Sequence, residues 1–458
     1  PLHWGLFALI AAAGQFLAWR ERDFAIVPTI GLALSVLLLA AWPDPSPGWF
    51  APIALSLAAI HALPLLARLW NAPASLRRAL ELCAIALAAA PLVKWHFWDI
   101  GDGALALVAL GGTGLAGAGI ALGWRREGRA GDGRFAWLTA TAALLVALAA
   151  LLLLPHWTAP LAVGGVAAAL LFFGRAAGDR RIEPVATGFV LLALLALAAP
   201  PFAFAELPRL AEGASGALSG RAPLRWFGLA LLLLPFALRG DGRALRTAAS
   251  ALAALLAYGG FAQFVPGGWL MLVPAIGGAA LLVAAQRVGL ARVAGGAAAF
   301  AALALAWAVL PVGLWGAKAG LSLAGWPMTL DLPGLAAREL VLRLLIPAAL
   351  FGVPLWLLRE ALPRSLRIAA LPVAGIVAGI AVHALYRLGF AAAFGEDFTA
   401  TGAAQRLLWA GLLIGGGWIA MRRGLAGLPP PLAIVGAAHA IWYGLVLPNP
   451  LWAEQAGG

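Results

Sequence analysis

Residues 134–181 read RFAWLTATAALLVALAALLLLPHWTAPLAVGGVAAALLFFGRAAGDRR, two apolar runs joined by a short turn at Pro155-His156-Trp157. Each run is close to the roughly 20 residues that a helix needs to cross about 30 Å of hydrocarbon. Arginines stand only at the two ends of the stretch. Backbone amides and carbonyls find no water inside a bilayer, so a spanning segment must pair them within a helix. The stretch therefore predicts a helical hairpin with both ends on one side of a membrane.

The same pattern recurs along the whole chain and divides it into sixteen apolar segments. These segments cover residues 2–19, 24–42, 49–69, 79–93, 104–124, 135–154, 157–173, 185–204, 224–238, 244–264, 269–285, 293–314, 341–358, 368–388, 407–421 and 432–447. The chain is 63% hydrophobic and only 11% charged, whereas soluble proteins are about one quarter charged. We therefore expect an all-α fold, a polytopic transmembrane helical bundle with about 16 spans in out–in–out hairpins. It would form a single integral membrane domain over residues 1–458.

Arginine marks every second gap between these segments. In chain order the gaps hold Arg20 and Arg22; Arg68, Arg77 and Arg78; Arg125, Arg126, Arg129 and Arg134; Arg175, Arg180 and Arg181; Arg239, Arg243 and Arg246; Arg287 and Arg292; Arg359, Arg364 and Arg367; Arg422 and Arg423. They are 22 of the 31 basic residues. Cationic residues stay on the cytoplasmic side of a membrane during insertion. The alternation predicts a bacterial inner-membrane protein with both ends of this chain on the periplasmic side.

The net charge of +12 does not indicate nucleic-acid binding, because the excess lies in the inner loops. Anionic lipid headgroups are its natural partner there, so the expected partners are membrane lipids and no nucleic acid. Cys83 is the only cysteine, which excludes an intrachain disulfide and a thiolate cluster. We expect neither a metal nor a cofactor. The chain begins at Pro1 and ends in polar residues 454–458, so a fragment of a longer protein is expected.

Two local patterns predict packing at membrane depth. Small-residue faces that let helix backbones approach closely occur at Gly119-x-x-x-Gly123, Gly375-x-x-x-Gly379 and Gly411-x-x-x-Gly415. Glu81 follows Arg77 by four residues, and Arg343 follows Glu339 by four. Residues at this spacing share one face of a helix, so each pair predicts an ion pair.

Histidines and outer-loop polar residues are the candidates for chemistry. His61, His383 and His439 lie inside apolar segments. Imidazole can relay protons near neutral pH, and His383 and His439 are the preferred candidates; a neutral histidine that bonds a backbone carbonyl is the alternative. The outer face adds Lys94, His96, Asp99, Asp102, Arg387, Glu396 and Asp397. Carboxylates beside cations suit acid–base or glycosyl chemistry, although solvated loop charges have the same sequence pattern. The outer gap 315–339 predicts a re-entrant or interfacial helix.

The C-terminal residues carry a resemblance to a known family. His439-Ala440-Ile441-Trp442-Tyr443 is followed by Leu447-Pro448-Asn449-Pro450-Leu451-Trp452. This segment resembles the large polytopic bacterial membrane proteins grouped as domain of unknown function 2339. The resemblance covers about fifty residues, implies a longer multi-pass protein and supplies no catalytic residue. It marks Asn449 and Trp452 as family positions.

Three classes of function remain after these observations. A transporter or flippase accounts for many spans, short loops and intramembrane histidines. A membrane enzyme that acts on a lipid-linked substrate at the periplasmic face accounts for the outer polar residues. A scaffold or assembly protein accounts for the lack of a specific motif. The transporter is preferred, with a small-molecule or lipid-linked substrate.

Overall fold

The computed structural model describes residues 2–71, 74–200, 202–215, 220–326, 328–395, 398–424 and 429–447. These residues form helices and turns, and the described ranges contain no strand. The all-α class predicted from sequence is therefore confirmed. The chain divides into two compact units, Pro1–Phe264 (unit 1) and Val265–Gly458 (unit 2). Each unit is described by itself.

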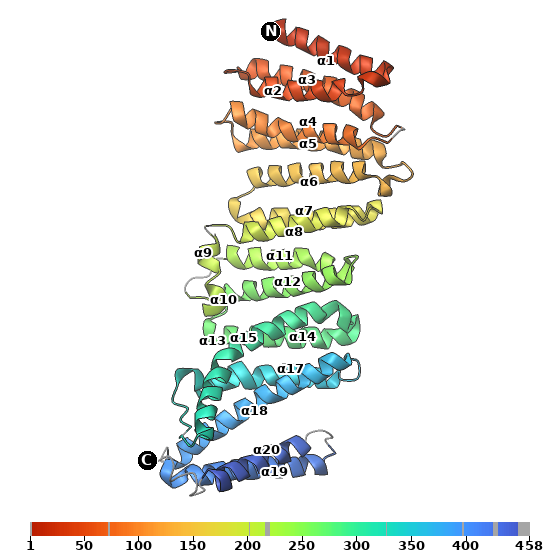
Figure 1. Cartoon of the computed structure of the whole chain (residues 1–458). Helices are drawn as coiled ribbons and strands as arrows, with labels where there is room; N and C mark the ends of the chain where they lie inside the picture. The colour runs from red at the N-terminus through yellow and green to blue at the C-terminus, as the bar shows by residue number, and fades with distance from the viewer. Residues whose placement is uncertain are drawn as a thin grey trace. The chain divides into compact units, whose positions relative to one another are not determined.

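Unit 1 is a series of antiparallel helices that pack on their neighbours in chain order (Figure 1). Its helices are α1 (Leu2–Arg20), α2 (Val27–Ala40), α3 (Pro47–Arg68), α4 (Leu76–His96), α5 (Asp102–Gly123), α6 (Gly133–Leu153), α7 (Ala159–Ala177), α8 (Ile182–Leu197), α9 (Phe202–Glu206), α10 (Arg209–Glu212), α11 (Arg221–Arg239) and α12 (Arg243–Ala262). The stretch 134–181, for which the sequence predicted a helical hairpin, folds into the hairpin of α6 and α7. Asp132 caps its start by accepting a hydrogen bond from the Arg134 amide at 2.9 Å. Gly178 ends α7 with φ +70°, a left-handed conformation that favours glycine.

Unit 2 contains α13 (Gly267–Leu270), α14 (Val273–Val288), α15 (Leu290–Leu323), α16 (Ala337–Leu340), α17 (Ile346–Leu357), α18 (Arg364–Phe394), α19 (Phe398–Arg422) and α20 (Pro429–Ile441). Two π-helical turns, Val341–Leu345 and Trp442–Val446, precede α17 and follow α20. Such turns are uncommon and often lie at functional sites. The helices α15 and α18 are unusually long, at 34 and 31 residues.

Every expected apolar segment falls on helix, but the expected number of membrane spans is not confirmed. Eleven described helices are long and apolar enough to cross a membrane, or up to twelve if the pair α8 and α9–α10, bent by 70°, counts as one span. The other segments fall short for local reasons. The helix α2 has only 14 residues, and α4 carries Arg77, Arg78 and Glu81 in its first turns. The helix α19 contains Arg406, and α20 has 13 residues before its π-helical turn.

Two predictions about local packing are wrong. The gap 315–339 is not one re-entrant or interfacial helix, because α15 continues through it to Leu323 and only short turns follow. Of the three glycine faces, only the first is closely packed: Gly123 lies against the Trp70 ring and Gly119 against leucine side chains. A Cβ added at Gly375, Gly379, Gly411 or Gly415 would meet no atom within 4 Å. Close approach between α19 and α20 occurs instead at Gly417 and Gly436.

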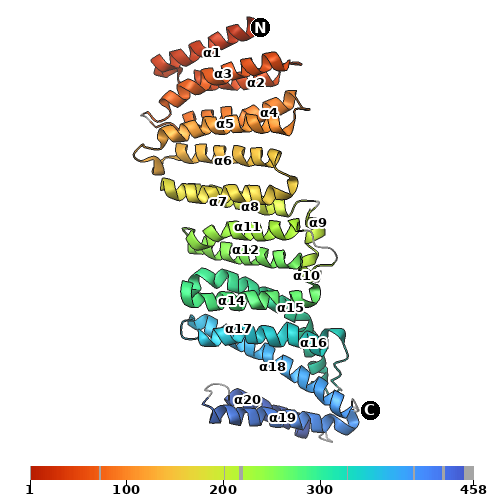
Figure 2. The same cartoon turned by 180° about the vertical axis from the view of Figure 1, so that it is seen from behind.

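The arginine-bearing turns gather at one end of the helices within each unit. In unit 1 these are the turns that follow α1, α3, α5, α7 and α11, and both views place them at the same end (Figures 1 and 2). In unit 2 the turns after α14 and α17 likewise share one end (Figures 1 and 2).

The predicted ion pairs Arg77–Glu81 and Glu339–Arg343 are both formed, so these charges have partners on their own helix faces.

Candidate functional site

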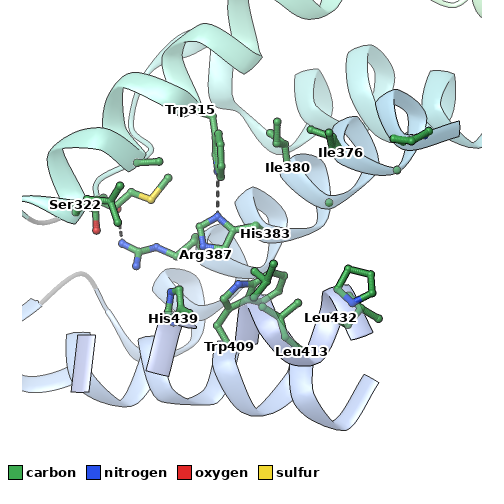
Figure 3. A pocket seen from close by; sticks show the side chains of 18 of the residues that line it. Trp315, Ser322, Ile376, Ile380, His383, Arg387, Trp409, Leu413, Leu432 and His439 are labelled. Carbon is green, nitrogen blue, oxygen red and sulfur yellow. Dashed lines mark hydrogen bonds between the residues drawn. The ribbon is translucent and has the colours of Figure 1, made fainter. Parts of the chain in front are cut away.

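A cavity of about 1050 Å³ in unit 2 is lined by residues of α15, α18, α19 and α20 (Figure 3). The helical repeat explains which side chains line it. On α18 the lining positions 376, 380, 383 and 387 are three or four residues apart, as are 406, 409 and 413 on α19. Positions 435, 439 and 443 follow the same spacing along α20 and its π-helical turn. Residues at this spacing share one helix face, so each helix presents one face to the cavity.

Arginines and hydroxyl groups line one end of this cavity. Arg387 donates from Nη2 to the Met328 carbonyl at 2.6 Å. Arg406 donates from Nη2 to the Ser322 hydroxyl at 3.2 Å, and its guanidinium lies 4.2 Å from the centre of the Tyr443 ring. The Tyr443 hydroxyl donates to the same Ser322 oxygen at 3.2 Å. Both arginines are buried, and no Asp or Glu is among the described residues that line the cavity. The described lining is therefore cationic.

Histidines and tryptophans form the middle of the cavity wall. The Trp315 indole N–H donates to His383 Nδ1 at 3.0 Å (Figure 3). His383 also lies edge-on to Trp409, with ring centroids 4.8 Å apart. The His439 ring is tilted by 52° against the Tyr443 ring, with centroids 4.6 Å apart, and its buried Nδ1 has no hydrogen-bond partner among the described residues. The indole bond requires an unprotonated Nδ1 on His383, whereas His439 keeps a nitrogen available to a ligand.

Three residues predicted from sequence thus line one cavity: His383, Arg387 and His439. Residues that the sequence analysis did not select complete it, notably Ser322, Arg406 and Tyr443. For Arg406 a signal existed, because it lies one residue before the apolar segment 407–421. Extending that segment by one turn would have shown an arginine in a spanning helix, which usually marks a functional site. Ser322 carries no comparable signal.

The predicted outer residues of unit 1 have separate environments. Lys94 donates to the Trp98 carbonyl at 2.7 Å, and His96 donates from Nε2 to the Leu39 carbonyl at 2.6 Å. Asp99 borders a cavity of about 610 Å³ within unit 1, and Asp102 is exposed in the first turn of α5.

Four predicted residues of the C-terminal part of the chain lie outside the described residues: Glu396, Asp397, Asn449 and Trp452.

His61 shows the alternative role of a histidine. Its Nδ1 accepts from the Gln15 amide at 3.0 Å, while its Nε2 donates to Ser35 Oγ at 2.9 Å. The Ser35 hydroxyl in turn donates to the Gly31 carbonyl at 2.8 Å. All polar atoms of the ring are therefore paired in a buried network, which is a structural role.

The described residues contain no group of three or more His, Cys, Asp or Glu side chains that could hold a metal ion. Comparison with models of protein families, with curated proteins and with solved structures finds no match to this chain.

Proposed function

We propose that the protein is a transporter or flippase of a bacterial inner membrane, with its substrate site in the cavity of unit 2. The observation that supports this most is the pair of buried arginines beside two histidines on apolar helices. Ionisable groups at membrane depth are costly and usually mark the path of a substrate or ion. A volume of about 1050 Å³ lies just above the range for small-molecule sites, about 300–1,000 Å³.

The proposal includes sixteen crossings, with the arginine-bearing turns on the cytoplasmic side. Two of the sixteen expected apolar segments lie between each pair of successive arginine-bearing turns, for example those that form α2 and α3 and those that form α4 and α5. If arginines remain on one side, both helices of a pair cross or neither does. Because α3 and α5 are long enough to cross, the short α2 and the charged α4 would cross with them.

Enzyme and scaffold functions rank lower in this proposal. The side chains of Lys94 and His96 are already bonded to backbone carbonyls, which disfavours an enzyme built on them. A scaffold does not account for a large cationic cavity.

We also propose that the chain belongs to the family that its C-terminal residues resemble, with Asn449 and Trp452 as the positions that identify this family.

Reconstitution of the full chain into liposomes tests transport. A panel of small organic anions and headgroup-labelled lipids would be followed, and at least one should move faster than in protein-free liposomes. Gly379→Leu adds a side chain where a Cβ meets no atom within 4 Å, so it should fill the cavity and return the flux to background. Gly389→Leu, on the same helix at an equally open glycine that does not line the cavity, is the matched control. If nothing in the panel moves, or if both variants behave alike, transport through this cavity is contradicted.

Membrane orientation has its own test. Cys83 is buried, so single cysteines can be introduced elsewhere in a Cys83→Ala background. An impermeant maleimide added to intact cells should label a cysteine at Asp44, between α2 and α3, and not one at Glu127, between α5 and α6. The reverse labelling would invert the proposed topology.

A further inference from the structure

The cavity of unit 2 has two chemically different parts. Its polar end consists of buried side chains: Arg387 is 7% exposed and Arg406 is 8% exposed. Its other part is mostly apolar and open at the molecular surface, where Ile376 is 62% exposed and Val435 is 55% exposed. The exposed Arg367 is the charged residue in the lining of this part. A ligand that fills both parts must carry a polar group at one end and an apolar body at the other.

Side chains at the polar end are suited to an anion. The Nε atom of Arg387 is buried without a hydrogen-bond partner among the described residues, although one Nη already bonds the Met328 carbonyl. His439 Nδ1 has the same status. Arg387 and Arg406 each bring a positive charge. Guanidinium groups bind phosphate or carboxylate oxygens with strong, directional hydrogen bonds. A buried donor that is left unpaired costs free energy, which an anionic headgroup would recover.

The apolar part is suited to a hydrocarbon chain. Gly375 and Gly379 stand one turn apart on α18 and leave room beside the helix, because no atom lies within 4 Å of a Cβ built there. Leu432 and Val435 of α20 and Leu413 of α19 also line this part. For a protein embedded in lipid, exposed apolar side chains face acyl chains rather than water. A chain can therefore enter the groove from the side without desolvation of polar groups.

We infer that this cavity binds an anionic amphiphile, with a phosphate or carboxylate headgroup at Arg387 and Arg406 and a hydrocarbon chain along Gly375 and Gly379. The inference rests on the proposed function in placing the substrate site here, and it adds the chemical class of the substrate. Length and charge both matter. A free anion would leave the groove empty, and a lipid without net charge would not compensate the positive charge of Arg387.

Binding to the purified full chain tests the inference directly. Native mass spectrometry in a mild detergent would compare phosphatidylglycerol, phosphatidylcholine with the same acyl chains, and glycerol 3-phosphate. One phosphatidylglycerol per chain should be retained at concentrations where the other two are not. Arg387→Gln should weaken this binding by about 10- to 100-fold, the contribution of one charge-assisted hydrogen bond. Gly375→Leu should weaken it as well, by filling the groove.

Matched controls separate the cavity from general effects. Arg359→Gln removes a positive charge from an arginine that does not line the cavity, and Gly389→Leu adds the same leucine outside it; neither should change binding. Equal retention of phosphatidylcholine would overturn the charge requirement, and equal retention of glycerol 3-phosphate would overturn the chain requirement. Undiminished binding of phosphatidylglycerol by Gly375→Leu, or no retained lipid at all, would overturn the inference.

The outcomes for the two proposals are distinguishable. If phosphatidylglycerol binds with the expected variant pattern but no flux occurs in liposomes, the inference holds and transport fails. If a small organic anion is transported through the cavity while phosphatidylglycerol does not bind, transport holds and the amphiphile is wrong.

Discussion

Arg225 in unit 1 and Arg387 in unit 2 are both buried arginines on apolar helices, and each has a buried Nε without a hydrogen-bond partner among the described residues, yet only Arg225 has a counter-ion there. Arg225 forms an ion pair with Glu206, and its guanidinium lies 4.0 Å from the centre of the Phe202 ring. The other Glu206 oxygen accepts the Trp226 indole N–H at 2.8 Å. Arg387 has only the Met328 carbonyl and makes no ion pair within the described ranges. A network closed by a counter-ion fixes a fold, whereas a buried arginine without a counter-ion among the described residues can accept an anionic ligand.

The histidines of the two units repeat this contrast. His61 is 1% exposed, and both of its ring nitrogens are bonded to protein groups. His61 borders the cavity of unit 1, and His383 and His439 line that of unit 2. The difference is that His439 has a nitrogen without a partner among the described residues. The same residue types are therefore bonded to protein groups at Arg225 and His61 in unit 1, whereas in unit 2 they line the cavity that we propose as a site. Substitutions in unit 1 should act on stability and those in unit 2 on binding.

The largest effect is expected when the closed network of unit 1 is opened. Glu206→Gln removes the charge that compensates Arg225 and should lower the free energy of unfolding by about 3–5 kcal/mol, as for other broken buried ion pairs. The measurement is unfolding by titration with a denaturing detergent. The double variant Glu206→Leu/Arg225→Met should recover most of the loss. A loss under about 1 kcal/mol in the single variant would mean that the pair is solvated.

His61→Phe should have the next largest effect, about 1–3 kcal/mol, because it leaves the Gln15 amide and the Ser35 hydroxyl without their shared partner. The same unfolding titration measures it. His156→Phe, at an exposed histidine in the turn before α7, is the control and should be nearly neutral. Equal effects at the two positions would remove the structural role assigned to His61.

Arg387→Met should change stability by less than about 1 kcal/mol in either direction, because it removes one neutral-acceptor hydrogen bond and one incompletely bonded buried cation. This small effect on unfolding, beside a large effect on lipid binding, would sharpen the contrast with Arg225. A loss as large as that of Glu206→Gln would show that Arg387 is part of the fold, and the difference between the two units would disappear.

The smallest effect is expected at Asp132, outside the spans. Burial alone would raise the pKa of Asp132, but hydrogen bonds from the Arg134 side chain and amide, with the charges of Arg134 and Arg181, lower this pKa below 3.8. A lowered pKa adds stability above pH 3.8, and this stability is lost as the pH falls through the lower, folded-state value. The contribution should stay below about 1 kcal/mol. Unfolding titrations down to about pH 3 should show it, and Asp132→Asn should abolish this pH dependence.

Local patterns predicted what depends on a single helix. Hydropathy and length located the helical segments, and the i,i+4 spacing found Arg77–Glu81 and Glu339–Arg343. The pair Arg225–Glu206 joins residues from different helices, so no local spacing reveals it. Gly375 and Gly379 matched a packing motif but face open space, since the motif does not specify whether a partner helix is present. His383 and Arg387 have the i,i+4 spacing that places them on one face of α18, but only tertiary packing brings Arg406 of α19 to the same cavity.

The length of α15 has a consequence for where a headgroup would meet water. At 1.5 Å per residue its 34 residues extend about 51 Å, roughly 20 Å more than the hydrocarbon layer. Its first residues follow Arg287, and Ser322 lies at its far end. With the arginine end held at one membrane surface, the helix must tilt or bend to keep Ser322 and the guanidinium that bonds it at the opposite edge of the hydrocarbon layer. Bilayer thickness would then decide how wet this end is, so the protein's behaviour should depend on the acyl-chain length of its host membrane.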